Sequence, residues 1–395
     1  MRLPSLELSL HRWYTKRGRG GHAEKTLRFL SFKKLMSIRI RPIDLDTDLD
    51  GVNAVGMRNG FPAFDPDARR HWWRSHPFRE EFEGIPRGWV LEDAAHRIVG
   101  AFSNVPMMYE LNRKRWKAAL ASSWAVDREH RSASLLLAMA YFNQQGVDLC
   151  LNGDANAVVS QLMAALKIPR VPAESCDLAY FWDIRHQAFA SAFLRKKKIP
   201  GAGLLAFPAS LLLGIADGFR RTSKRLENDI RRLSDFGDEF DVLWEKIRLS
   251  PDTLRAVRNS AALRWRFGPA LKNEGAVVLG LFRKNAMRGY AVLSANVRDA
   301  LDLRTYVLAD LQIAEDSLDD LGGLLQGAIR AAREDGREAL KWWGWNAEKR
   351  RAARSYRPWP YRYPYWPAFY KAVNPALKPM LAQPECWDFS PFDVF

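Results

Sequence analysis

A short polar turn in the first half of the chain carries the strongest chemical signal. Residues 127–131 follow an apolar strand-like run and precede a helix-like run. A helix N-terminus offers unpaired backbone N–H groups and a partial positive charge, so it attracts phosphate. Arg131 adds a fixed cation with planar donors at the same place. The turn is typical of a phosphate site, although a purely structural strand–turn–helix unit has the same pattern.

Two strands and one helix must position this turn. Residues 120–126 read as a strand, and the apolar residues after the turn recur at helical spacing. Ser132 or Ser134 can cap that helix, and Gly146 is expected to stop it. A second strand follows at 147–151, so the unit predicts a right-handed strand–helix–strand crossover.

The spacing of Val126, Arg131 and Ser134 resembles the motif of the GNAT superfamily of acetyl-CoA-dependent N-acetyltransferases. In that family the loop amides hold the coenzyme A pyrophosphate, and a backbone N–H at the end of the strand polarises the thioester carbonyl. Ser134 and Leu136 stand where the family has its two small residues, Gly and then Gly or Ala. The resemblance implies that acetyl-CoA, or another acyl-CoA, is bound by Trp124, Ala125, Val126, Arg131, Ser132, Ala133, Ser134, Leu135 and Leu136.

Residues 156–168 resemble the family's second helix. Asn156 matches the family's Asn, and Asp154 is a suitable N-cap. Met163 stands where the family has a Tyr that protonates the departing thiolate, and Met cannot donate a proton. Another group donates, or solvent donates, or the domain binds without catalysing.

The resemblance implies direct attack of a neutral amine on the thioester, with a general base near the acceptor amine. The sequence offers four candidates for catalytic roles, each of which is as easily a surface or capping residue. They are Glu92, Ser122, Asp127 and Asn156.

The remaining elements of the first domain follow the family's order. Residues 38–42 read as its opening strand, and 44–82 as two helices rich in aromatic residues. Those helices wall the acceptor site in such a fold, although core packing explains most of the aromatic side chains. Strands are expected near 88–94, 97–106 and 118–127, with a turn at Asn112, Arg113 and Lys114.

Composition limits the classes of function. The chain has 395 residues, a net charge of +16, three cysteines and seven scattered histidines. The charge predicts an acidic partner, but the common nucleic-acid motifs are missing, so no nucleic acid is expected. The cysteines form no disulfide framework or metal motif, which indicates a cytoplasmic protein without a metal.

The domain boundaries follow from shifts in composition. Residues 1–35 form a basic tail that precedes Met36, and residues 36–190 form the acyl-CoA-binding GNAT-like domain. Residues 236–395 repeat the order of three strands, a helix and a strand, which predicts a second, degenerate GNAT-like domain. Its matching turn at 315–320 is acidic and repels phosphate, so one coenzyme A site per chain is expected. The fold class is α+β, with two mixed, mostly antiparallel sheets flanked by helices.

Two stretches of the second half have alternative interpretations. Residues 191–235 hold a short apolar run between basic flanks, which suits an interdomain helix or a helix lying on an anionic membrane; the interdomain helix is preferred. The aromatic, Pro-rich residues 356–372 exclude a helix over most of their length. Packing against the sheet is preferred there over an exposed platform.

The leading function is that of a tandem GNAT-like N-acyltransferase of the bacterial type. It is expected to transfer an acyl group, most simply acetyl, to an unidentified amine on an amino sugar, amino acid or peptide. At most a peripheral contact with the membrane is expected. Two alternatives stay open: a degenerate GNAT fold that only binds, and an aminoacyl-tRNA-dependent transferase.

Overall fold

The computed structural model describes residues 38–153, 155–172, 178–220, 229–250, 252–296, 302–314, 317–344, 347–362 and 368–394. The basic tail at 1–35, Asp154, and the acidic positions Glu315 and Asp316 lie outside the described residues. The chain forms two compact units. In its described part the first unit comprises 38–63, Gly88–Phe102 and Ser123–Ala140, and the second comprises Phe64–Arg87, Ser103–Ser122 and the described residues from Tyr141 onward.

The first sheet is mostly antiparallel, and two of its long strands pass through both units. In this sheet β4 (Lys114–Val126) and β5 (Leu149–Asn152) pair in parallel, which fits a helical crossover between them, whereas β1–β2, β3–β8 and β5–β14 pair antiparallel. Asn112 and Arg113 have φ angles of 52° and 63°, which makes the tight hairpin expected between β3 and β4. The strand order is β1 (Arg39–Pro42), β2 (Gly88–Glu92), β3 (Ile98–Leu111), β4 (Lys114–Val126), β5 (Leu149–Asn152) and β14 (Phe369–Ala372), with β8 (Arg255–Ala256) paired to β3.

The helices around this sheet follow the apolar periodicity of the sequence. The aromatic stretch 44–82 forms the two expected α-helices and, in addition, a short 3-10 helix. The helix after the turn ends at Phe142, not at Gly146, although Gly146 does adopt a left-handed φ of 85°. Their bounds are α3 (Leu49–Arg58), α4 (Pro66–Arg74), η1 (Arg79–Phe82), η2 (Arg128–Ala133), α5 (Ser134–Phe142) and α6 (Ala157–Ala165).

The second sheet repeats the predicted order of three antiparallel strands, a helix and a parallel strand. Its strands β9, β10 and β11 pair antiparallel, and β12 returns parallel to β11 after helix α11 (Leu318–Glu334). The sheet has the order β13 (Trp359–Arg362), β6 (Leu178–Asp183), β12 (Ala339–Trp342), β11 (Thr305–Ile313), β10 (Ala286–Asn296), β9 (Ala276–Arg283) and β7 (Asp229–Leu233). The predicted α+β class with two mixed, mostly antiparallel sheets is therefore confirmed.

Each half of the sequence contributes strands to the other half's sheet. β6 pairs antiparallel with β12 of the second sheet, although its residues precede position 190. Conversely β14, from near the C-terminus, pairs antiparallel with β5 of the first sheet. The described parts of the aromatic stretch 356–372 therefore pack as strands, as the preferred interpretation held.

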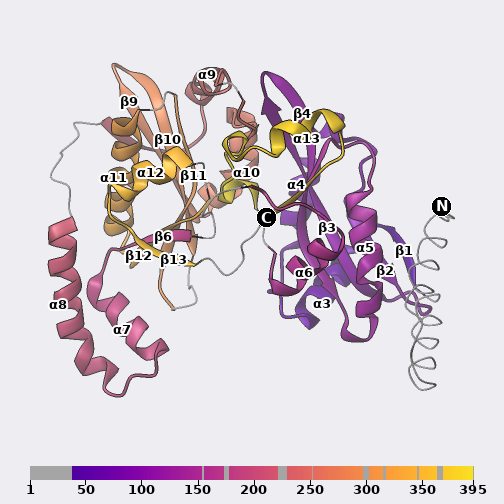
Figure 1. The fold of residues 1–395 in the computed structure, drawn as a ribbon, viewed down its shortest axis with the longest axis horizontal. Coiled ribbons are helices and arrows are strands. Elements are labelled where there is room, and N and C mark those ends of the chain that lie inside the picture. The colour runs from indigo at the N-terminus through magenta and orange to yellow at the C-terminus, as the bar shows by residue number, and fades with distance from the viewer. Residues whose placement is uncertain are drawn as a thin grey trace. The chain divides into compact units, whose positions relative to one another are not determined.

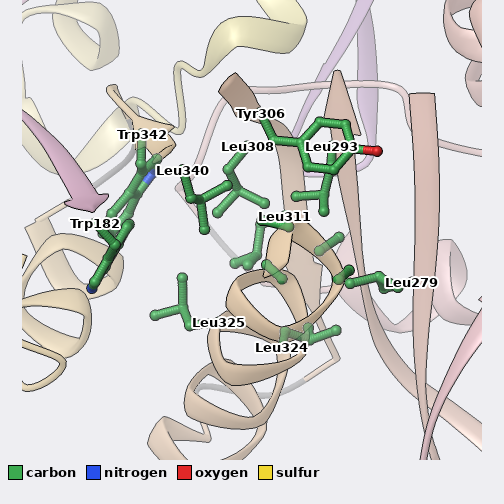
Figure 2. Close-up of a cluster of buried hydrophobic side chains, with 14 of the residues drawn as sticks. Trp182, Leu279, Leu293, Tyr306, Leu308, Leu311, Leu324, Leu325, Leu340 and Trp342 are labelled. Carbon is green, nitrogen blue, oxygen red and sulfur yellow. The ribbon is translucent and has the colours of Figure 1, made fainter. Parts of the chain in front are cut away.

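A leucine-rich core fills the space between the second sheet and α11. Figure 2 shows Leu308, Leu324 and Leu340 among side chains that point toward one another from strands and helix. Trp182 and Trp342 stack at one side of this core, with ring centroids 6.1 Å apart. Burial of each such leucine contributes about 1.5–3 kcal/mol, which makes this sheet a firm scaffold.

The other helices of the second unit complete the architecture in Figure 1. Within the described residues, no helix is long and apolar enough to cross a bilayer. The helix bounds are α7 (His186–Lys196), α8 (Ala202–Arg220), α9 (Asp238–Ile247), α10 (Ser260–Lys272), α12 (Ala347–Arg354), η3 (Pro375–Leu377), α13 (Lys378–Leu381), η4 (Pro384–Cys386) and η5 (Pro391–Asp393).

Candidate active site

The candidate acyl-CoA residues follow one another along the end of β4, the 3-10 helix η2 and the start of α5, all in the first unit. β4 pairs with β5 only as far as Leu120, which lies opposite Leu151. The strand nevertheless continues to Val126, and Ser123 turns through a left-handed φ of 54°. Beyond Leu120 the side of β4 that faced β5 therefore has no β5 partner in the described structure.

Trp124, Ala125 and Val126 are the last three residues of that strand. The Trp124 ring stacks on Phe102, with centroids 4.6 Å apart and planes 3° from parallel. Ala125 and Val126 are buried. The indole Nε1 of Trp124 and Nδ1 of His130 are buried, and neither has a hydrogen-bond partner among the residues that the structure describes. Such orphaned groups are uncommon in native proteins.

The turn itself is more helical than its sequence indicates. η2 begins at Arg128 and continues without a break into α5, so neither Ser132 nor Ser134 starts the helical segment. The amide of His130 donates to the carbonyl of Asp127, and the amide of Ser134 donates to the carbonyl of Arg131. None of residues 131–136 is a glycine and none adopts a left-handed φ, in agreement with this helical backbone.

The side chains of the turn divide into an exposed and a packed set. Arg131 and Ser132 are exposed, which leaves the guanidinium available to an anion. Ala133 is buried, whereas Ser134, Leu135 and Leu136 are half-buried.

Asp127 is held by an arginine that the sequence reasoning missed. Its carboxylate accepts two hydrogen bonds from Arg58, at 3.0 Å from Nε and 2.8 Å from Nη2. This bidentate pair ties the turn to the last residue of α3 and raises the pKa of Arg58. Arg58 and Asp127 are 69 residues apart in sequence, so local patterns cannot predict their pairing. The one signal in the sequence is that Asp127 directly follows an apolar strand.

Glu92 lies at the end of β2 in a different cluster of charges. Its buried carboxylate accepts hydrogen bonds from Arg41 Nε at 2.9 Å and pairs with His96 Nδ1 at 2.6 Å. These hydrogen bonds, first from Arg41 and then from His96, lower the pKa of Glu92. A carboxylate that binds its proton less tightly is a weaker general base near neutral pH.

Ser122 and Asn156 belong to the second unit, where each makes a specific contact. The buried Ser122 Oγ accepts a hydrogen bond from Arg69 Nη1 at 3.0 Å. Asn156 is the N-cap of α6, a position that the sequence reasoning gave to Asp154, and its side chain accepts from the amide of Val159 at 3.0 Å. Capping explains Asn156 without a catalytic role.

Arg69 is a second functional candidate that the sequence reasoning missed. It lies on α4 between the rings of Phe64 and Trp72, with its guanidinium carbon 4.4 Å and 4.5 Å from their centroids. Burial lowers the pKa of Arg69 to about 10. The clustering of arginines with aromatic residues on a predicted helix is the signal that could have identified it.

Met163 is fully buried on α6. Its side chain therefore packs inside the second unit, whereas a proton donor must reach the departing sulfur. Within the described residues no group of acidic, His and Cys side chains is arranged to hold a metal ion.

No protein-family profile and no curated protein matches the sequence. A solved structure of a protein from Enterococcus faecalis V583, titled a probable N-acyltransferase, shares 10% identity and covers 85% of this chain and 72% of its own, at a TM-score of 0.52. Saccharomyces cerevisiae N-myristoyltransferase with bound myristoyl-CoA shares 10% identity over 77% of this chain and 76% of its own, at 0.47. A GCN5-related N-acetyltransferase from Kribbella flavida shares 14% identity and covers 77% of this chain and 63% of its own, at a TM-score of 0.46. The first likeness shows that the chain has the fold of this probable N-acyltransferase, as its resemblance to the GNAT superfamily predicted.

Proposed function

We propose that the protein is an acyl-CoA-dependent N-acyltransferase, with acetyl as the simplest acyl group. The observation that carries the proposal is the end of β4, which continues past its last pair with β5 and turns at Ser123. Past that point the backbone of β4 no longer bonds the backbone of β5, and this is where we place the thioester of the substrate. The fold shared with a probable N-acyltransferase supports this assignment.

In the proposed reaction a neutral amine attacks the thioester carbonyl, a C–N bond forms and the C–S bond breaks. A backbone N–H among Trp124, Ala125 and Val126 stabilises the negative charge that develops on the carbonyl oxygen. The exposed Arg131, with Ser132, holds the coenzyme phosphates, and Ala133, Ser134, Leu135 and Leu136 form the adjoining wall.

The amine proton needs an acceptor. Asp127 and Glu92 are both paired with arginine, and the hydrogen bonds from Arg41 and His96 lower the pKa of Glu92, so that carboxylate accepts a proton less readily than an unpaired one. Solvent therefore takes the larger share of this proton in the proposed mechanism. Water also protonates the departing thiolate, since free thiols have a pKa near 8.5 and the thiolate is a tolerable leaving group.

Titration calorimetry with acetyl-CoA, followed by a thiol-release assay with mixed amines, tests the proposal. The variant Arg131→Glu is expected to weaken acetyl-CoA binding about tenfold or more, because it places a carboxylate beside phosphate. Arg39→Glu, on the exposed face of β1, is the matched control and should bind normally. Equal affinity of the two variants would contradict the assigned phosphate site.

A binding protein without catalysis is the second candidate, favoured by the burial of Met163 where the family has a proton donor. Acetyl-CoA binding without thiol release for any amine would support it. Copurified small RNA would instead support the aminoacyl-tRNA-dependent transferase. The cytoplasmic location inferred from the cysteine pattern belongs to the same proposal, and Cys150 and Cys386 are buried free thiols.

A further inference from the structure

Helix α8 exposes the large apolar residues that a helix of a water-surrounded protein normally buries. Leu204 is 85% exposed and Leu212 is 69% exposed. The other large apolar side chains on this surface are Leu205, Phe207 and Leu211, each at least 46% exposed. A contiguous patch of this kind marks a binding surface for another molecule or a membrane.

The patch occupies one side of the helix. Leu204, Pro208 and Leu211 recur at the spacing of one helical face, and Leu205 and Leu212 lie beside them. The residues toward α7 are small: Ala206 is buried, and a side chain added at Gly214 would lie 3.5 Å from His186. α7 and α8 pack side by side as a hairpin (Figure 1). α8 therefore exposes its large apolar side chains and packs its small residues against α7.

Cations border this patch. Arg195 and Lys196 end α7, and Lys197 and Lys198 follow them before α8 begins. All four are exposed, and so are Phe193 and Ile199 beside them. The sequence from 186 to 216 contains no Asp or Glu. The surface thus combines exposed leucines with a run of exposed cations.

We propose that the α7–α8 hairpin docks the protein on an anionic phospholipid membrane, with α8 lying in the plane of the interface. Leucine and phenylalanine side chains enter the boundary between headgroups and acyl chains, and the cations contact lipid phosphates. α8 continues through Pro208, and none of the described helices is long and apolar enough to cross a bilayer, so we propose a peripheral contact.

The charge pattern favours this occupant over the others. A second copy of the chain on the same patch would bring two sets of these cations together, which is unfavourable. A nucleic acid would satisfy the cations but leave the leucines in water. An anionic membrane satisfies both sets of side chains. This inference replaces the preferred interdomain interpretation, and it is independent of the proposed acyl transfer.

Co-sedimentation of the full-length protein with lipid vesicles tests the proposal. We expect binding to vesicles of phosphatidylcholine with phosphatidylglycerol, weak binding to phosphatidylcholine alone, and loss of binding in high salt. Lys197→Glu with Lys198→Glu should weaken binding at least about thirtyfold, since the loss of each surface cation costs a factor of about five and the added carboxylates are repelled by the anionic lipids. Leu204→Ser with Leu212→Ser should weaken it about tenfold or more.

Two control variants match these changes elsewhere in the second unit. Val242→Ser on α9 removes an apolar side chain that is 59% exposed, and Lys378→Glu reverses an exposed charge on α13. Both should bind vesicles as the unchanged protein does. The proposal is overturned if neither vesicle binds, if the controls lose as much as the hairpin variants, or if light scattering shows that the leucine variants dissociate a dimer. Binding of RNA that depends on the lysines but not on the leucines would also overturn it.

Discussion

The family resemblance and the structure lead to opposite expectations for the substitution Met163→Tyr. The family resemblance implies that a Tyr there would supply the missing proton donor and raise turnover by up to about a hundredfold. The structure leads to the opposite result, because Met163 has no exposed surface. Tyr adds a rigid ring to a filled site, which costs about 1–3 kcal/mol, and it buries a hydroxyl, which costs about another 1–3 kcal/mol without a partner. We therefore expect Met163→Tyr to destabilise the protein by about 2–6 kcal/mol.

Urea unfolding measures this loss, and thiol release with acetyl-CoA measures turnover on the same samples. Met163→Leu is the control, because a swap of similar volume costs less than about 1.5 kcal/mol. A Met163→Tyr protein as stable as the unchanged chain, with faster turnover, would refute the packing argument. It would also place Met163 beside the departing sulfur.

Two further predictions concern buried ionisable side chains of the second unit. Burial lowers the pKa of His76 to about 3, so between about pH 6.5 and 3 the unfolded chain binds a proton that the folded chain refuses. Stability should therefore fall as the pH drops below 6.5, by about 2 kcal/mol at pH 5, and urea unfolding of His76→Gln should show this much less acid dependence. Lys349 Nζ lies 2.8 Å from a carboxylate oxygen of the buried Asp388, so Lys349→Met should cost about 3–5 kcal/mol of unfolding free energy. Arg351→Met, exposed on the same helix, should cost less than about 0.5 kcal/mol; equal losses in the two variants would show that the buried pair is not special.

Local patterns predicted the elements of this fold well. The strand expected near 88–94 is β2, at Gly88–Glu92, and the expected turn after β3 lies at Asn112 and Arg113. Such features depend on alternation and on turn chemistry, which a short window of sequence contains. The pairing of β6 with the second sheet and of β14 with the first sheet could not be predicted in this way. The residues of a strand determine which face is buried, but not which distant strand pairs with it.

The candidate site was predicted less completely. The positions from Trp124 to Leu136 could be assigned to a strand, a turn and a helix, but the 3-10 geometry of η2 could not. The Arg58–Asp127 and Arg69–Ser122 contacts join residues far apart in sequence. Long-range pairs of this kind arise from tertiary packing, and no local propensity encodes them.

The exchange of strands between the sheets has a consequence for synthesis on the ribosome. β5 obtains its partner β14 only when residues 369–372 emerge. At about 5–20 residues per second, this edge of the first sheet waits roughly 10–40 s in the nascent chain. Meanwhile β6 awaits β12, so neither half can finish folding before most of the polypeptide is made. Premature termination would leave an open strand edge, and such fragments are prone to aggregate.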